Sequence, residues 1–427
     1  MSISADQTEL VPIALPTDLS PAPTGWQWTK LTELARLESG HTPSRSRPDW
    51  WDGDVSWISL TEIRRLDGHW TEETRIKTNP AGIAHSAARI LPKGTVCFSR
   101  TASVGFVTIM AKPMATSQDF ANWVCGDELD PEFLMYALIR SRDYLRTLAS
   151  GATHKTIYMP TLEQFRICAP PRAEQERIVA ALNAQMAAAE GARVASETQV
   201  EEIQSLAYAL IRHPLKSKSA LQMFALGDVL EEVKSGIGSA WASYPVLGAT
   251  RDGLAAAKEP VGKHPERYKP VVPGTLFYNP MRILIGSIAM VDDGDAPGIT
   301  SPDYVVLRGK RGVVDTRWFY YWLRSPLGAA CIASLARGAV RERMLFNRLA
   351  QGTIELPAFD MQCRISESLA LIRPLQLQAL ARSRDIESLP RRLLRDVFSS
   401  QLSDMAREFA SARTSTADGG SSTIYNP

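Results

Sequence analysis

The 427-residue sequence is poor in cysteine and has no long apolar run. Its five cysteines are scattered, odd in number and without a CxxC spacing, so neither a zinc site nor a disulfide framework is indicated. No run of eighteen apolar residues could cross a bilayer, and residues 1–24 contain prolines and acids where a signal peptide has an apolar core. We therefore expect reduced thiols, no membrane partner and a cytoplasmic protein.

The sequence also lacks a strong net charge and the common catalytic motifs. The net charge is only +2, and basic residues are in excess only in the second half, so any nucleic-acid surface must be a local patch. The six histidines show no metal-ligand spacing, and no GxxxxGK[ST] phosphate loop or complete dinucleotide fingerprint is present. The segment from Asn279 to Arg282 (NPMR) lacks the aromatic residue that an amino-methyltransferase stacks on a flipped base. We expect no catalytic residue and no metal ligand in this chain.

What the sequence does contain is a long helical segment. The stretch from Arg172 to Arg212 has no proline and is rich in Ala, Glu, Gln and Leu, which predicts one continuous helix. Its seam positions recur at gaps of four and three, as in a coiled coil, with small or polar residues in the middle. At about 1.5 Å per residue the helix would span about 60 Å, more than a domain of this size needs for its core. Such a helix is typical of a spacer.

A second copy of this pattern follows downstream. Adding 187 carries Ile178 to Ile365 and Leu182 to Leu369, and the match extends upstream to Gln175 and Gln362. Past the middle of the helix the better register shifts by four residues, the size of a coiled-coil stutter. The predicted seam positions, which would also face partners, are Ile178, Leu182, Ile203, Leu206 and Leu210 in the first helix and Ile365, Leu369, Ile372, Ile386 and Leu393 in the second. The chain is therefore a tandem repeat.

The repeat predicts an α+β organisation. Its parts are a disordered tail (1–24), a first globular unit (25–171), a long helix (172–212), a linker (213–223), a second globular unit (224–357), a second long helix (358–400) and a disordered tail (401–427). Each unit is expected to open with a short helix, over 28–40 and 224–236, and to continue as a mixed or antiparallel sheet. Pro374 and Pro390 are expected to kink or interrupt the second long helix.

The junction before the first long helix carries a family resemblance. Pro170-Pro171 followed by Glu174-Gln175-Glu176-Arg177-Ile178-Val179 resembles the junction in the specificity subunit of type I restriction-modification systems. The alternation of globular unit and long helix extends the resemblance over residues 25 to about 400. The second copy departs from the pattern, since it keeps Gln362, Arg364 and Ile365 but loses the Glu.

This resemblance implies a fold, a function and partners. The globular units would be two target recognition domains with pseudo-two-fold symmetry, each reading one half of a split sequence in double-stranded DNA. The long helices would form an antiparallel coiled coil that sets the spacing and docks two modification (methyltransferase) subunits. A restriction (motor and nuclease) subunit would join them in a type I site-specific deoxyribonuclease and adenine methyltransferase. No cofactor would bind this chain; S-adenosylmethionine, ATP and magnesium would bind the partner subunits.

Sequence reading of DNA needs donors on exposed loops, with backbone contacts supplying most of the affinity. The first-unit candidates are Arg45, Arg47, Ser99, Arg100, Thr101, His154 and Lys155. The second-unit candidates are Lys263, Arg267, Lys269, Asn279, Arg282, Arg337, Arg341 and Arg343. For any one of these, a solvated surface charge is the simpler interpretation, and the clusters are more informative than their members. The alternative function is a coiled-coil scaffold whose repeated heads bind protein; a free-standing methyltransferase is disfavoured by the missing motifs.

Overall fold

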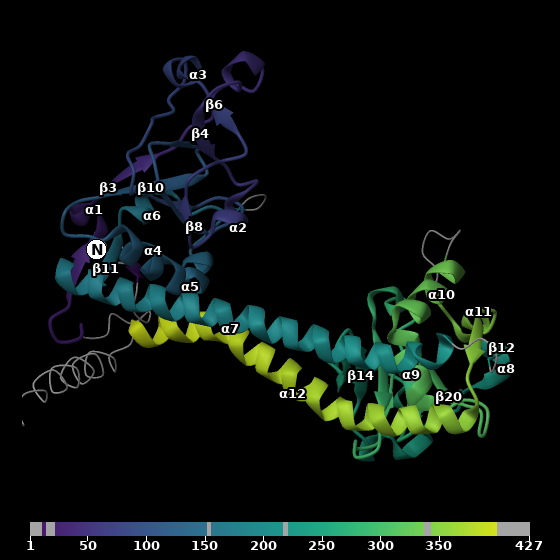
Figure 1. Ribbon diagram of the computed structural model, residues 1–427. Coiled ribbons are helices and arrows are strands. Elements are labelled where there is room, and N and C mark those ends of the chain that lie inside the picture. The colour runs from purple at the N-terminus through teal and green to yellow at the C-terminus, as the bar shows by residue number, and fades with distance from the viewer. Residues whose placement is uncertain (1–10, 14–21, 152–154, 217–220, 337–342, 399–427) are drawn as a thin grey trace, which may run out of the picture. The chain divides into compact units, whose positions relative to one another are not determined.

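The computed structural model describes residues 11–13, 22–151, 155–216, 221–336 and 343–398 (Figure 1). The chain forms two compact units: unit 1 is Met1–Gly191 with Ser388–Pro427, and unit 2 is Ala192–Glu387. The boundaries fall inside the long helices, because each globular region packs its own stretch of both helices into its core. None of the helices in the described ranges is long and apolar enough to cross a membrane.

Unit 1 combines a five-stranded sheet with two three-stranded sheets. The five-stranded sheet has the order β3-β10-β7-β8-β5, with β10 antiparallel to both β3 and β7. Before the long helix, the elements of unit 1 are β1 (Val11–Ile13), β2 (Gln27–Lys30), α1 (Leu31–Leu34), β3 (Ala35–Ser39), η1 (Pro48–Trp50), β4 (Val55–Ile58), α2 (Ile63–Leu66), β5 (Trp70–Thr71), β6 (Lys77–Thr78), α3 (Pro80–Ala84), β7 (Val96–Ser99), β8 (Val107–Met110), β9 (Ala115–Thr116), β10 (Phe120–Cys125), α4 (Pro131–Arg140), α5 (Arg142–Thr147), α6 (Met159–Leu162) and β11 (Phe165–Ala169).

Unit 2 is built around a four-stranded sheet with the order β13-β20-β17-β18. Between the long helices, its elements are η2 (Pro214–Lys216), β12 (Gln222–Ala225), α8 (Leu226–Val229), β13 (Leu230–Glu232), η4 (Gly238–Ser243), β14 (Leu247–Thr250), β15 (Gly253–Ala256), η5 (Pro265–Arg267), β16 (Lys269–Val271), β17 (Thr275–Tyr278), η6 (Ile283–Ile285), β18 (Ile288–Val291), β19 (Gly298–Thr300), β20 (Val305–Gly309), α9 (Thr316–Arg324), α10 (Pro326–Ala336), α11 (Phe346–Leu349) and β21 (Thr353–Leu356).

The two main sheets have the same strand order. β3, β10, β7 and β8 of unit 1 correspond in sequence and neighbours to β13, β20, β17 and β18 of unit 2. The helix after the sheet also corresponds: α4 buries Phe133 and Tyr136, and α9 buries Trp318 and Tyr321. The internal repeat is therefore a repeat of folded units, and the predicted α+β class is confirmed.

The start of each unit differs from the prediction. The segments expected to form a short helix contain only one helical turn, α1 or α8, between two strands. In unit 1 the strand that follows, β3, pairs with β10, and in unit 2 β13 pairs with β20. Cross-strand pairing of these residues overrides their local helical preference. The expected disordered tail over 1–24 also contains an ordered piece, since β1 pairs in parallel with β11 and buries Val11 and Ile13.

The long helices are α7 (Arg172–Arg212) and α12 (Phe359–Val397), drawn in teal and yellow in Figure 1. The bounds predicted for α7 are confirmed, whereas Pro374 and Pro390 do not interrupt α12. In unit 1 the beginning of α7 shares a core with the end of α12, through Leu182 and Leu394. In unit 2 the end of α7 shares a core with the beginning of α12, through Ile211 and Leu369. The helices therefore run antiparallel.

The packed face of α7 changes register along its length. Gln175, Leu182, Ala189 and Ser196 are buried at steps of seven, and Ala207 follows after eleven. Because a step of eleven is a heptad plus a stutter of four, the apolar face moves around the helix. Leu206, which the sequence placed on the seam, is consequently 53% exposed. The other predicted seam positions are buried or half-buried: Ile178, Leu182, Ile203, Leu210, Ile365, Leu369, Ile372, Ile386 and Leu393.

Candidate nucleic-acid interface

Each globular region is fixed to its long helix by the same buried glutamine. Gln175 accepts a hydrogen bond from Asp130 N at 2.9 Å, and its amide donates to the carbonyl oxygens of Pro170 (2.9 Å) and Glu128 (3.0 Å). Gln362 accepts from Asp315 N at 3.0 Å and donates to the carbonyl oxygens of Pro357 (2.9 Å) and Val313 (3.1 Å). Gln175 and Gln362 are each only 1% exposed. This shared network explains why the junction keeps its glutamine in both copies.

The aspartates in these networks also begin the helices that follow. The carboxylate of Asp130 accepts from the backbone N–H of Glu132 (2.8 Å) and Phe133 (3.0 Å), and that of Asp315 accepts from Trp318 N (2.8 Å). An aspartate at this position satisfies N–H groups that the first turn of a helix leaves unpaired. The glutamine and the aspartate therefore align one helix of each globular region with the start of its long helix.

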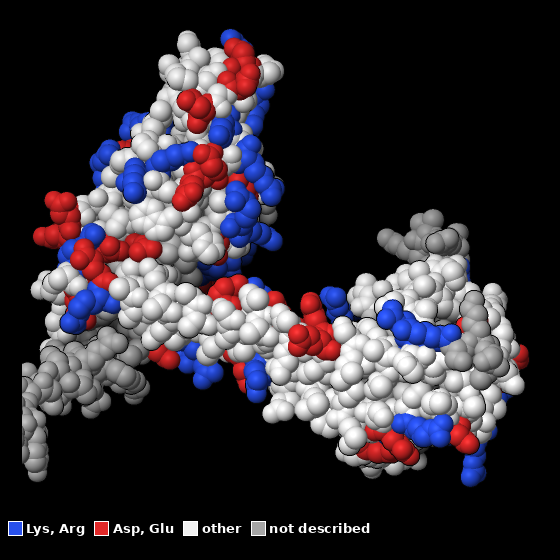
Figure 2. All heavy atoms as spheres, in the orientation of Figure 1, with Lys and Arg blue, Asp and Glu red and all other residues white. Residues whose placement is uncertain are grey.

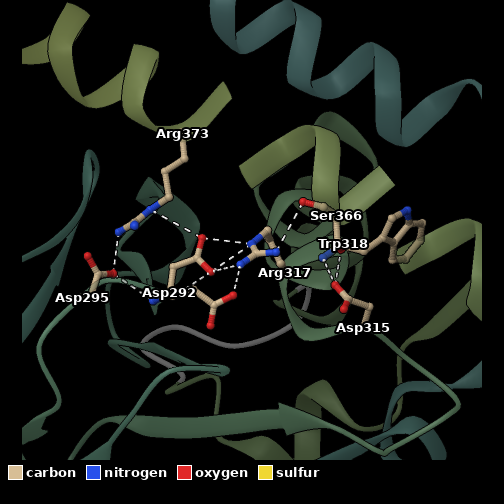
Figure 3. Close-up of polar contacts among 8 residues, drawn as sticks. Asp292, Asp295, Asp315, Arg317, Trp318, Ser366 and Arg373 are labelled. Carbon is tan, nitrogen blue, oxygen red and sulfur yellow. Dashed lines mark hydrogen bonds and ion pairs between the residues drawn. The ribbon is translucent and has the colours of Figure 1, made fainter. Parts of the chain in front are cut away.

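Unit 2 has an additional ion-pair network at this joint (Figure 3). Arg317 of α9 donates Nε to both oxygens of Asp292 (2.9 and 3.0 Å), and Arg373 of α12 donates to Asp295 at 2.6 Å. Asp292 is almost fully buried, and the hydrogen bond to its carboxylate is the main reason that the pKa of Arg317 is raised. Because a buried carboxylate needs its partners, this network holds the end of β18, α9 and α12 together.

In unit 1, the candidates Arg45 and Arg47 lie on an exposed loop, where their guanidiniums contact tryptophan rings. The guanidinium carbon of Arg45 lies 3.8 Å from the ring centroid of Trp51 and 4.9 Å from that of Trp57. Arg47 lies 4.8 Å from the Trp50 centroid and forms two hydrogen bonds with Asp49, at 2.8 and 3.0 Å. Stacking fixes the plane of a guanidinium while leaving its edge available for a base or phosphate. Of these two arginines, only Arg47 pairs its charge with a carboxylate among the described residues.

The candidates Ser99 and Arg100 are part of the internal structure of the next loop. Ser99 is buried, and its hydroxyl bonds Ser103 O and accepts from Phe106 N at 2.9 Å. Arg100 is half-buried and donates to the carbonyl oxygens of Gln118 (2.9 Å) and Ile157 (3.4 Å), and burial lowers its pKa. Both residues therefore support the loop rather than extend from it.

The remaining first-unit candidates lie at the outer part of this loop. Thr101 forms a bridge with Thr156, and the N–H of Ala102 donates to Lys155 O at 2.9 Å. Ala102 has a left-handed backbone (φ 56°), which is unusual for a residue other than glycine. The structure thus brings Thr101 next to exposed Lys155. His154 lies outside the described residues.

The candidates in unit 2 form two groups. Lys263 and Arg267 are exposed on the segment before β16, whereas Lys269 is half-buried and donates to Tyr304 O at 2.7 Å. Burial lowers the pKa of Lys269. Lys269 therefore stabilises the segment on which Lys263 and Arg267 are exposed.

The second group surrounds the loop between β17 and β18. Asn279 closes the loop, since its side-chain oxygen accepts from Met281 N at 3.0 Å. Arg282 is exposed, and Arg343 lies close to the same loop because Met344 N donates to Pro280 O at 3.0 Å. Arg343 pairs loosely with Asp303, at 3.7 Å. Arg337 and Arg341 lie outside the described residues.

Within residues 11–13, 22–151, 155–216, 221–336 and 343–398, no group of three or more His, Cys, Asp or Glu side chains could hold a metal ion. The candidate loop residues are instead mainly Arg and Lys, whose donors contact phosphates and base edges.

Sequence reasoning missed a further basic cluster around Phe106, formed by Arg64, Arg142 and Arg146. These arginines come from two helices far apart in the chain, and neither helix carries a recognisable basic motif. No signal in the sequence showed that the three side chains meet.

Two α+β units, each built on stretches of two long antiparallel helices, define the fold class of this chain. A chain in a solved structure of the type I R-M system has a similar fold, with a TM-score of 0.54 and 17% identity over 88% of this chain and 98% of that chain.

Residues 23–192 match the family described as type I restriction modification DNA specificity domain. This match confirms the resemblance found in the sequence. The MjaIX specificity subunit of Methanocaldococcus jannaschii is 27% identical over 170 residues, 39% of each chain. The HindI specificity subunit of Haemophilus influenzae is 29% identical over 133 residues, 31% of this chain and 28% of that subunit. The matched segments thus span well under half of these relatives.

Proposed function

We propose that this chain is the DNA sequence-recognition subunit of a type I restriction-modification complex. Each globular region reads one half of a bipartite target, and the long helices set the spacing between the halves. The observation that carries the proposal is the structural repeat. Unit 2 lies almost wholly beyond the segment that matches the specificity domain, yet it has the strand order and buried glutamine network of unit 1. A protein with two similar reading heads suits a ligand with two separated sites.

In this proposal the chain itself performs no chemistry. Two modification subunits dock on the long helices and bind S-adenosylmethionine, and a restriction subunit uses ATP and magnesium. The exposed face of the helices supports a docking role, since Leu206, Leu371 and Leu375 are 53%, 78% and 53% exposed. Large exposed apolar side chains of this kind mark surfaces that bind partners.

The test is to produce the chain with its modification subunits in a methylation-free host and map methylated adenines across the genome. A bipartite motif with a fixed unspecified gap is expected. A complex that forms but methylates nothing, or a chain that binds neither these subunits nor DNA, would favour a coiled-coil scaffold with protein-binding heads.

A deletion in the helix tests the spacer role separately. Removing four residues between Ala187 and Ala195 of α7 shortens the helix by about 6 Å and turns its end by more than a full revolution. The deletion is expected to change the gap between the two halves of the motif or to abolish methylation. An unchanged gap in an active complex would show that the helices do not set the spacing.

A further inference from the structure

The largest concentration of arginine on one aromatic ring in unit 1 is at Phe106. The guanidinium carbons of Arg64, Arg142 and Arg146 lie 5.7, 5.2 and 5.7 Å from the centroid of this ring. Phe106 is half-buried and immediately precedes β8, while Arg64 belongs to α2 and the other two to α5. Figure 2 shows Lys and Arg side chains gathered over the part of unit 1 where Figure 1 labels α2, β8 and α5.

The three arginines differ in how their charges are compensated. Arg142 is largely buried, with Nη2 donating to both oxygens of Asp67 (2.7 and 2.8 Å) and Nε to Gly105 O (2.8 Å). Arg146 donates Nε to Val104 O at 3.1 Å and is 3.4 Å from Asp143, whose side chain is 90% exposed. Arg64 is exposed, and within the described residues it forms no ion pair with a carboxylate. The cluster therefore keeps uncompensated positive charge at Arg64 and donors at Arg146.

The backbone of the loop is shaped to hold these side chains. Gly105 has φ 97°, a conformation that favours glycine. A Cβ at this position would lie 2.8 Å from Cγ of Arg142 and 3.6 Å from Nε of Arg146. The consecutive carbonyl oxygens of Val104 and Gly105 accept hydrogen bonds from Nε of Arg146 and Arg142. Both guanidiniums therefore lie beside the Phe106 ring. Contact with the face of the ring stabilises the cations in these positions.

We infer that Arg64 and Arg146, held around Phe106, bind a backbone phosphate of double-stranded DNA next to the half-site read by unit 1. This inference rests on the proposed function. The site is continuous with a candidate reading loop, because Ala102, two residues before Val104, bonds Lys155. Phosphate contacts position a protein on the duplex, and base contacts specify the sequence. The cluster accordingly adds affinity and register, and it does not choose the target bases.

The experiment measures DNA affinity of the full chain in complex with its modification subunits, as a function of salt. The duplexes carry either the mapped target or a scrambled sequence. Arg64→Gln combined with Arg146→Gln is expected to reduce the slope of log affinity against log salt by about 1, because one phosphate contact contributes about 0.9. Between 50 and 200 mM salt, the factor by which affinity falls should therefore be roughly threefold smaller for the double variant than for the unmodified chain. The preference for target over scrambled DNA is expected to stay unchanged.

Two variants serve as controls. Arg64→Lys keeps the charge and is expected to keep the slope. Arg89→Gln removes an arginine that is 67% exposed and paired with Glu38, a carboxylate that Arg36 also contacts. It removes one positive charge, where the double variant removes two, and is expected to leave the slope near that of the unmodified chain.

Each other outcome has a definite meaning. If the double variant has the same salt slope as Arg89→Gln, the inference is overturned. A loss of preference for target over scrambled DNA also overturns it, because these arginines would then read bases. Loss of modification subunits with an unchanged slope would assign the surface to protein contact. If the unmodified complex itself neither prefers nor methylates a target, the proposed function fails instead. Hydrogen exchange of β7 and β8 at the unmodified level shows that each variant is folded.

Discussion

The two units use the same loop in different ways. In both, a glycine with positive φ lies just before the strand β8 or β18: Gly105 at 97° and Gly286 at 85°. In both, an arginine from the following helical segment donates to that glycine's carbonyl, Arg142 at 2.8 Å and Arg324 at 3.4 Å. The anchor of the loop is therefore a property of the repeat.

What the anchored loops present is different. In unit 1 the next residue is Phe106, which is surrounded by arginines. In unit 2 it is Ser287, which is buried and donates to Ala249 O at 2.7 Å, while Leu284 and Ile285 are 63% and 67% exposed. A shared scaffold with different exposed side chains is what two reading heads need if their half-sites differ. The scaffolds themselves differ in the ion-pair network of unit 2, and we expect the largest loss of stability when this network is broken.

Arg317→Met should destabilise unit 2 by about 3 kcal/mol, because it leaves the buried Asp292 without its main partner. Arg373, 3.8 Å from Asp292, compensates only partly. Hydrogen exchange of β17 and β18 measures the loss, and β7 and β8 of unit 1 serve as the internal reference. Equal acceleration in both units would mean that they unfold as one, and no acceleration in unit 2 would show that the network is dispensable.

Gln175→Ala and Gln362→Ala should each destabilise their own unit by about 2 kcal/mol, since each leaves an N–H and two carbonyl groups without a buried partner. The same exchange measurement applies, now with the two variants as each other's control. If the two losses differ by more than about 1 kcal/mol, the two junctions are not energetically equivalent despite their common geometry.

Arg45→Ala should weaken binding of target DNA by about 1.5 kcal/mol, roughly tenfold, and relax selectivity at the half-site of unit 1 only. Duplexes altered in one half or the other show which half loses discrimination. Arg343→Ala is the matched change in unit 2 and should affect the other half. Equal losses at both halves for either variant would contradict the assignment of one half-site to each unit.

Leu206→Ala should change the free energy of unfolding of unit 2 by no more than about 0.5 kcal/mol, because this side chain lies off the packed face. Ile211→Ala, at a position that is 0% exposed, should cost about 2 to 4 kcal/mol. Urea unfolding of the two variants compares them directly. A large loss for Leu206→Ala would place this side chain back on the packed seam, where the sequence predicted it.

Much of the fold could be predicted because its signals are periodic or repeated. The bounds of α7 follow from helix propensity and the absence of proline, and the aromatic core of α4 and α9 follows from helical spacing. Prediction failed where pairing partners decide the structure. β3 and β13 have helix-compatible sequences, and only β10 and β20 make them strands. Pro374 remains helical because packing of Leu369 and Ile372 into the core outweighs one lost backbone hydrogen bond.

The candidate interface was less predictable than the fold. Arg45 and Arg282 are exposed as expected, but Arg100 and Lys269 donate to backbone carbonyls of their own unit. The sequence does not distinguish a basic loop residue that faces solvent from one that stabilises the loop. Which of these it does depends on the carbonyl groups that other segments bring close to it.

The sequence by itself determined that this protein is a tandem repeat with two long helices and a glutamine at each junction, because those features are local or recur at a fixed offset. Only the tertiary structure decided which arginines share a surface. Arg64 and Arg146 lie 82 residues apart in the chain (146 − 64), and they meet at Phe106 because the folded unit brings α2 and α5 to the start of β8.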